Sequence, residues 1–176
     1  MEALLVIDMQ KDFCYEKGAL YVPRVEEIFD STSKVVNEAR KKMTVIFTQD
    51  WHREDDPEFK IWPKHCLANT WGAEIIDELG AKVSDYFVKK RRYSAFFATD
   101  LDLILRELKV KKIYVCGVVT NICVLHTAAD AKQLGYEVVI LEDCTKALSN
   151  YEQEYAIRHM KNVFNAKIIN SKEFIK

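Results

Sequence analysis

Apolar runs of strand length alternate along the chain with segments of helical period, and this alternation limits the possible folds more than any other feature. The runs ALLVIDM (3–9) and TVIFTQD (44–50) are almost continuously apolar. Strands with this composition are buried on both faces, as in a parallel sheet covered by helices. The sequence therefore predicts an α/β domain built on a parallel sheet.

The rest of the chain continues the alternation. Further strands are predicted at 85–90, 112–119, 136–143 and 166–170, and helices at 25–42, 73–80, 100–110, 121–135 and 150–164. Together these elements predict a three-layer Rossmann-like fold, in which a parallel six-stranded sheet has helices on both faces. No linker or repeat interrupts the pattern, so we expect a single domain over residues 1–176. The 22-residue connection 51–72 is long for such a fold, and long loops are commonly functional.

The charge balance argues against two classes of partner. The chain has 26 basic and 27 acidic residues, a net charge of −1, and KKRR (89–92) is its one strong basic run. Such a chain has no field that would attract nucleic acid or an anionic membrane, so neither is an expected partner. The beginning of the chain, MEALLVIDMQ, lacks the basic flank and long apolar segment of a signal peptide. The chain has five cysteines, an odd number, and no two of them form a CxxC pair. This indicates reduced thiols and a cytoplasmic location.

Reactive side chains follow four of the predicted strands. Asp8 and Asp50 end the first two strands, Lys89 and Lys90 end the third, and Cys123 begins the helix after the fourth. In an open parallel sheet, ligands bind outside the carboxyl ends of the strands, near the point where the strand order reverses. We therefore expect two acids, a lysine and a cysteine to meet at one edge of the sheet.

These residue types together suit nucleophilic catalysis. A thiolate is a much better nucleophile than a thiol, and a helix N-terminus or a nearby ammonium stabilises it. A carboxylate within reach can take the thiol proton and later give it to a leaving amine. Asp8, Lys90 and Cys123 could supply these three roles. Taken singly, each has an ordinary explanation, since Cys123 could be a packed apolar residue, Asp8 a turn cap and Lys90 a surface lysine.

Two histidines and an aspartate point to a metal ion. On an extended segment, residues i and i+2 face the same side, so Asp50 and His52 could share one ion with His65 from the long loop. Three protein ligands of this type leave coordination positions open, as in catalytic metal sites. The alternative is that the two histidines have no common role.

The segments LLVIDMQKDF and KRRYSAFFATDLDLILRELKVKKIYVCGVVTNICVLHTAADA resemble the isochorismatase-like cysteine hydrolases over residues 3 to about 143. The resemblance implies the isochorismatase-like hydrolase fold, with Asp8 as general base, Lys90 as catalytic lysine and Cys123 as nucleophile. The presence of Cys123 implies cleavage of a C–N bond. The resemblance also implies a cis peptide bond between Val118 and Val119, with the Val119 and Cys123 N–H groups forming an oxyanion hole.

The long loop resembles the metal loop of the nicotinamidases in this family. The matching motifs are QDWH and WPKHCLANTWGAE, which imply a divalent metal ion, with zinc preferred over manganese or iron, held by Asp50, His52 and His65. Glu58, in PEFK, is a weaker fourth ligand. The substrate pocket falls on Phe13 and Trp62, whose rings could enclose a flat molecule. The implied reaction on a small amide is hydrolysis of nicotinamide to nicotinate and ammonia.

Several alternatives stay open at this point. N-carbamoylsarcosine and ureidoacrylate amidases use a similar Asp–Lys–Cys set on ureido groups, and a non-catalytic binding protein could also have this fold. A phosphate-binding protein is disfavoured, because DMQKDF replaces the glycine-rich turn after the first strand. Asn121 stands where most relatives have an acidic residue, and a shift of one position would exchange Lys89 for Lys90. Members of the family are often oligomeric, so a homo-oligomer is consistent with the resemblance.

Overall fold

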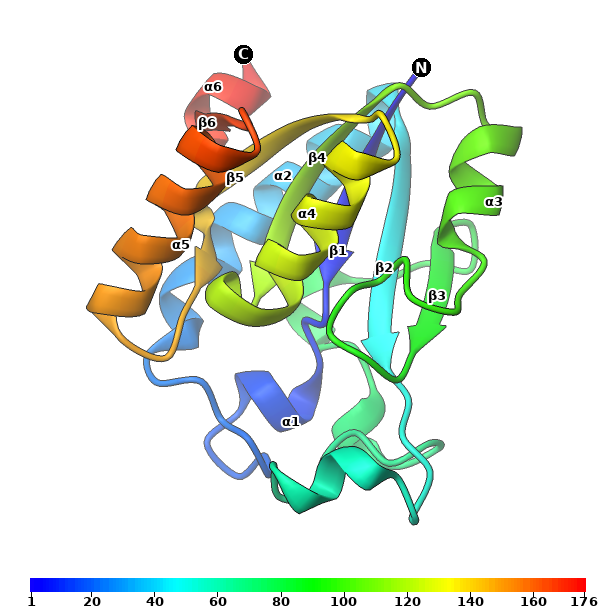
Figure 1. Cartoon of the computed structure of the whole chain (residues 1–176), viewed down its shortest axis with the longest axis vertical. Coiled ribbons are helices and arrows are strands. Elements are labelled where there is room, and N and C mark those ends of the chain that lie inside the picture. The colour runs from blue at the N-terminus through cyan, green and yellow to red at the C-terminus, as the bar shows by residue number, and fades with distance from the viewer.

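Six parallel strands form one sheet in the order β3-β2-β1-β4-β5-β6, which confirms the predicted sheet. The computed structural model describes every residue from Met1 to Lys176. The chain builds outward from β1 on one side, through β2 and β3, and then returns to place β4 on the other side of β1 (Figure 1). The strand order therefore reverses between β1 and β4, where ligands bind in folds of this type. The bounds of the strands are β1 Glu2–Ile7, β2 Thr44–Asp50, β3 Tyr86–Lys90, β4 Lys112–Val118, β5 Glu137–Lys146 and β6 Lys167–Ile169.

Helices cover both faces of the sheet, as predicted for a three-layer fold. Successive side chains of β1 point to opposite faces, so Leu4 packs in one apolar core and Leu5 in the other. The first core lies against α2 (Phe29–Lys42) and α6 (Ser171–Ile175). The second core lies against α3 (Leu101–Glu107), α4 (Leu125–Gln133) and α5 (Asn150–Val163). None of these helices has the length and apolar content needed to cross a bilayer.

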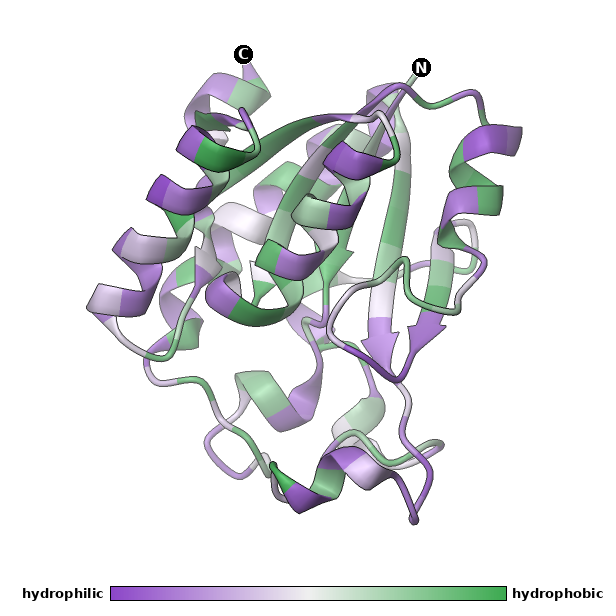
Figure 2. Ribbon diagram, viewed as in Figure 1, coloured by the Kyte–Doolittle hydropathy of each residue, from purple (hydrophilic) through white to green (hydrophobic).

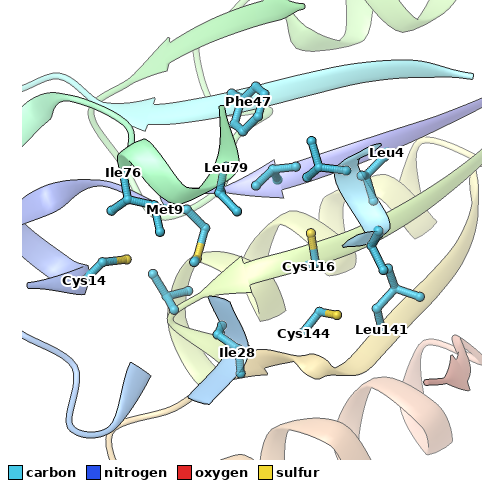
Figure 3. Packing of buried hydrophobic residues seen from close by; sticks show 14 of the residues in the cluster. Leu4, Met9, Cys14, Ile28, Phe47, Ile76, Leu79, Cys116, Leu141 and Cys144 are labelled. Atoms are coloured by element: carbon cyan, nitrogen blue, oxygen red, sulfur yellow. The ribbon is translucent and has the colours of Figure 1, made fainter. Parts of the chain in front are cut away.

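Four of the five cysteines serve as apolar packing residues. Figure 3 shows Cys14, Cys116 and Cys144 among the aliphatic side chains of the first core. Burial raises the pKa of the Cys116 thiol well above its usual value and that of Cys144 to about 12. Cys66 is also fully buried, and burial raises its pKa well above the usual value. All four are therefore held as neutral thiols.

The predicted helix at 73–80 is wrong. The segment contains two separate 3-10 turns, Trp71–Ala73 and Asp77–Leu79, with extended backbone between them. Its backbone bonds to the residues that follow β1: the Lys11 N–H donates to the Glu74 carbonyl, and the Ile76 N–H donates to the Met9 carbonyl. These tertiary hydrogen bonds replace the intrahelical ones that its periodicity suggested.

The predicted helices at 25–42 and 121–135 are present, but each begins with a turn that is not α-helical. A 3-10 turn over Val25–Ile28 precedes α2, and a π-helical turn over Thr120–Val124 precedes α4. Single π turns of this kind are frequent at functional sites. The short helices α1 (Lys11–Cys14) and α6 were not predicted, because four or five residues are too few to show a helical period.

Polar side chains gather at the carboxyl end of the sheet. The arrowheads of β2 and β3 are hydrophilic in Figure 2, whereas the bodies of these strands are largely hydrophobic. α1 and the long loop lie beyond this end of the sheet (Figure 1). Here β4 approaches β1 closely: Gly117 has φ +108°, and a Cβ on it would lie 2.0 Å from the Ile7 carbonyl oxygen. A glycine at this position lets the two strands meet where the site is built.

Candidate active site

Asp8 directly follows β1 and is held by the neighbouring strand. Its backbone is in the left-handed region with φ +48°, which turns the chain sharply at the end of the strand. The Asp8 N–H donates to the Thr48 hydroxyl oxygen (3.1 Å), and the same hydroxyl donates to Asp8 Oδ1 (2.6 Å). Both residues are fully buried. Thr48 thus fixes the backbone and the carboxylate of Asp8 together.

Lys90, the last residue of β3, places its ammonium at the centre of the site. Its Nζ lies 2.7 Å from Asp8 Oδ2, and it donates to Asp50 Oδ1 (2.5 Å), the Arg92 carbonyl oxygen (3.0 Å) and the sulfur of Cys123 (3.4 Å). The closest of these contacts are the two to carboxylate oxygens, so the ammonium lies between Asp8 and Asp50 and beside the sulfur. Asp8 Oδ2 faces the ammonium and the thiol together, which places it to accept the thiol proton.

The neighbouring lysine points elsewhere. The Lys89 side chain is exposed and lies over the Trp51 ring, 3.9 Å from its centroid. Adjacent residues on a strand face opposite sides, so only one of the two lysines can reach the site. The structure brings Lys90 to it, as the family resemblance implied.

Cys123 lies in the π-helical turn that follows β4. Its side chain is buried and is within hydrogen-bonding reach of the Asp8 carboxylate as well as of Lys90. The Val118–Val119 peptide bond is cis, as the family resemblance implied. The Val119 N–H donates to no group of the protein, so it is available to a ligand atom near the sulfur.

The charges of the site determine its resting protonation. Burial raises the pKa of Cys123 well above its usual value; the Lys90 ammonium opposes this shift, and the Asp8 and Asp50 carboxylates add to it. Burial would lower the pKa of Lys90, but the Asp50 and Asp8 carboxylates raise it well above its usual value. Burial and the charge of Asp50 raise the pKa of Asp8. The resting site therefore holds a neutral thiol beside a charged ammonium, and the thiol must lose its proton before the sulfur can act as a nucleophile.

The three predicted metal ligands come together beside this set. One ligand atom each from Asp50, His52 and His65 lies within 4.8 Å of the others, and all three residues are buried. Asp50 Oδ2 is 3.6 Å from His52 Nε2 and 3.7 Å from His65 Nε2. Glu58 lies at the rim, with Oε1 3.9 Å from His52 Nε2, in keeping with its weaker assignment.

The hydrogen bonds of the two histidines fit a metal site. His52 Nδ1 faces the Asp56 carboxylate at 3.1 Å, and His65 Nδ1 faces the Pro63 carbonyl oxygen at 2.7 Å. Both partners are acceptors, so each ring has a hydrogen on Nδ1, and in the neutral form each has its lone pair on Nε2. His52 Nε2 is buried without a hydrogen-bond partner. A cation between the Nε2 atoms and Asp50 would satisfy that atom, so the residues present fit a divalent metal ion.

An apolar pocket of about 240 Å³ opens onto the sulfur and the metal ligands. Phe13 and Trp62, the two predicted pocket residues, both line it. Sequence reasoning missed Tyr93, whose hydroxyl accepts a hydrogen bond from Trp62 Nε1 (3.0 Å) and fixes that wall. Tyr93 is only three residues after Lys90, so its closeness in the chain could have indicated that it lies near the site. The complete lining is Phe13, Ala19, Leu20, Tyr21, Asp50, Glu58, Trp62, His65, Tyr93, Val119, Ile122, Cys123 and Leu148.

Asn121, which stands where most relatives are acidic, is not part of this pocket lining. Its amide oxygen is buried and accepts no hydrogen bond. Nothing in the structure explains the substitution.

Known proteins with this architecture were compared with the chain. Residues 2–173 match the isochorismatase domain. The nicotinamidase of Escherichia coli is 31% identical over 90% of this chain and 89% of its own. The pyrazinamidase of Pyrococcus horikoshii, solved in complex with zinc, superposes with a TM-score of 0.90 at 37% identity, covering 96% and 98% of the two chains. The N-carbamoylsarcosine amidase of Thermoplasma acidophilum superposes with a TM-score of 0.87 at 32% identity, covering 97% and 96%.

Proposed function

The chain belongs to the isochorismatase family of hydrolases, and from this premise we propose that it converts nicotinamide and water to nicotinate and ammonia. One observation carries the proposal: the Asp8–Lys90–Cys123 set and a metal-ligand cluster open into the same small aromatic pocket. A flat neutral ring suits the apolar walls, and a carboxamide on it would face the sulfur.

The pocket also supports a neutral substrate over an anionic one. Its only acidic or basic lining residues are Asp50, Glu58 and His65, and no lysine or arginine is among them. Ureidoacrylate and N-carbamoylsarcosine each carry a carboxylate, for which the pocket offers no lysine or arginine. The charge of a bound divalent ion would already be balanced by the Asp50 and Glu58 carboxylates. A ureido substrate is therefore the second candidate.

The reaction follows from the contacts of Cys123. Asp8 takes the thiol proton through Oδ2, and the sulfur attacks the carboxamide carbon. Lys90 remains charged and stabilises the thiolate as it forms. The Val119 and Cys123 N–H groups bind the oxyanion, and Asp8 returns the proton to the departing ammonia. Water then cleaves the thioester, which releases the acid and restores the thiol.

Asp50, His52 and His65 would hold the divalent ion, with Glu58 as a further ligand. When bound, the ion supplies a Lewis acid at the pocket wall, to which a pyridine nitrogen can bind. The protein's own contribution is to orient the ring between Phe13 and Trp62, so that the carboxamide points toward Cys123.

Ammonia release from the purified protein tests the substrate. We expect turnover of nicotinamide and pyrazinamide, loss of turnover after treatment with a chelator, and recovery on adding zinc. N-carbamoylsarcosine and ureidoacrylate should react at least about 100-fold more slowly, since a buried unpaired charge costs several kcal/mol. Faster release from a ureido acid would reverse the assignment. No release from any of the four would favour a non-catalytic binding protein.

The pH dependence of the reaction tests Asp8 as the base. Asp8 must be deprotonated to act, so activity is lost as the pH falls through its pKa. The hydrogen bond from Thr48 stabilises the carboxylate and lowers this pKa. Thr48→Val should therefore move the acidic limb of the kcat/KM profile to higher pH, by about one unit for one lost hydrogen bond.

A matched control is Thr32→Val in α2, since Thr32 is also fully buried but its hydroxyl has no hydrogen-bond partner. The control should leave the limb unchanged. An unchanged limb in Thr48→Val as well would argue that another group takes the proton.

A further inference from the structure

Asp56 is a buried carboxylate outside the set of predicted ligands. It occupies the N-cap of the 3-10 helix Pro57–Lys60, and its side chain is 0% exposed. Its Oδ1 accepts hydrogen bonds from the Glu58 N–H (3.0 Å) and Arg92 Nη1 (3.1 Å), and its Oδ2 faces His52 Nδ1 (3.1 Å). Arg92 Nη1 also lies 3.5 Å from Oδ2, but the shorter contacts place both N–H donors on Oδ1 and the His52 ring on Oδ2.

The contact with His52 determines which ring nitrogen carries the hydrogen. A carboxylate only accepts, so the Nδ1 that faces it carries a hydrogen, and in the neutral ring the lone pair is on Nε2. That Nε2 points toward Asp50 Oδ2 and Glu58 Oε1 and has no hydrogen-bond partner. If the hydrogen moved to Nε2, His52 could no longer be a ligand through that atom.

Arg92 connects the same carboxylate to the reactive set. Its guanidinium pairs with Asp56, while its backbone oxygen accepts a hydrogen bond from Lys90 Nζ (3.0 Å). The residue therefore joins the loop of His52 to the end of β3, where Lys90 lies. One network, buried except at the partly exposed Arg92 side chain, connects the predicted metal ligands to the Lys90 ammonium beside the sulfur.

We propose that Asp56 is a positioning residue that holds His52 in the tautomer needed for metal binding and ties the metal loop to Lys90 through Arg92. The inference rests on the metal site of the proposed function, but not on the identity of the substrate. It concerns a residue that touches neither the substrate nor the reacting atoms.

The isosteric variant Asp56→Asn should reverse the tautomer. Two N–H donors, from Glu58 and Arg92, converge on the position of Oδ1, so the amide oxygen of the asparagine would take that place. The amide NH₂ would then face His52 Nδ1, which must become the acceptor. The hydrogen would move to Nε2, the atom directed at the metal position.

Two measurements on the folded, metal-free protein test this. Zinc affinity is measured by competition with a chromophoric chelator. The His52 tautomer is measured from the ¹⁵N chemical shifts of its imidazole nitrogens. The chain has four histidines, and the signals that disappear in His52→Ala identify those of His52. We expect Asp56→Asn to weaken zinc binding about 10- to 100-fold. We also expect its His52 signal to change from the Nδ1–H to the Nε2–H form, which a purely structural defect would not produce.

Asp55→Asn is the matched control, because it makes the same change at the next residue. Asp55 is exposed and pairs only with Arg53, so zinc affinity and the tautomer should stay as in the wild type. If Asp56→Asn does not fold, Asp56→Ser retains a capping oxygen for the Glu58 N–H and is too short to reach His52. This variant should also lose zinc affinity.

The outcomes separate the two proposals. Wild-type zinc affinity and an unchanged tautomer in Asp56→Asn would overturn the role of Asp56 and leave the metal site intact. A wild-type protein that binds no zinc would overturn the metal site and the positioning role together. Neither readout requires turnover, so a wrong substrate would not affect the result.

Discussion

Cys123→Ser is expected to reduce ammonia release from nicotinamide by on the order of 10⁴-fold or more, a loss typical of a removed nucleophile. A serine hydroxyl is a far weaker acid than a thiol, and burial among carboxylates disfavours its anion further. Asp8, whose raised pKa suits it to take a thiol proton, cannot deprotonate such a hydroxyl. The side chains are close in size, so the π-helical turn and the oxyanion N–H groups should stay in place.

The control for this variant is Cys144→Ser. Cys144 is equally buried but lies in β5, in the apolar core of the opposite face. A hydroxyl there should lower the melting temperature, because it buries a polar group, and should leave kcat unchanged. Activity within tenfold of the wild type in Cys123→Ser would mean that the nucleophile lies elsewhere.

The position of the site could be predicted from sequence because the carboxyl ends of parallel strands lie side by side at one edge of the sheet. Residues that follow different strands are therefore close together in the folded protein. Asp8, Lys90 and Cys123 are far apart in the chain, yet each stands at the carboxyl end of a strand or just beyond it. Apolar runs show where buried strands end, so the meeting of these side chains follows from the fold class. Strand alternation also meant that only one of Lys89 and Lys90 could reach the site, and the family resemblance pointed to Lys90.

Other features depend on contacts that no periodicity encodes. Thr48 looks like one more residue of a buried strand until the register places it beside Asp8. Asp56 looks like a helix cap, and its contact with Arg92 joins two segments whose pairing exists only in the folded chain. The raised pKa of Cys123 likewise depends on how completely the site is buried, which outweighs the ammonium beside it. The helix predicted at 73–80 failed for a related reason, since its backbone pairs with the turn after β1.

Asp50 contacts both Lys90 and the two histidines, so we expect it to be the most sensitive of the proposed metal ligands. Oδ1 accepts the hydrogen bond from Lys90, while Oδ2 faces His52 and His65. Its backbone is held separately: the Asp50 N–H donates to Gln10 Oε1 (2.7 Å), and Gln10 Nε2 donates to the Asp50 carbonyl (2.9 Å). Asp50→Asn should therefore change the charge without moving the strand end.

Asp50→Asn is expected to weaken zinc binding about 100-fold and to lower kcat/KM by on the order of 10³-fold even when zinc is saturating. The second effect has two causes: Asp50 Oδ1 accepts a hydrogen bond from the Lys90 ammonium and holds its charge beside Cys123, and the charge of Asp50 raises the pKa of Asp8 and so makes it a stronger base. His52→Ala removes a ligand without touching Lys90, so excess zinc should restore most of its activity. Zinc titrations of both variants, followed by ammonia release, distinguish the two cases. Full recovery of Asp50→Asn at high zinc would show that Asp50 acts only as a ligand, and that the metal cluster and the Lys90 ammonium are independent.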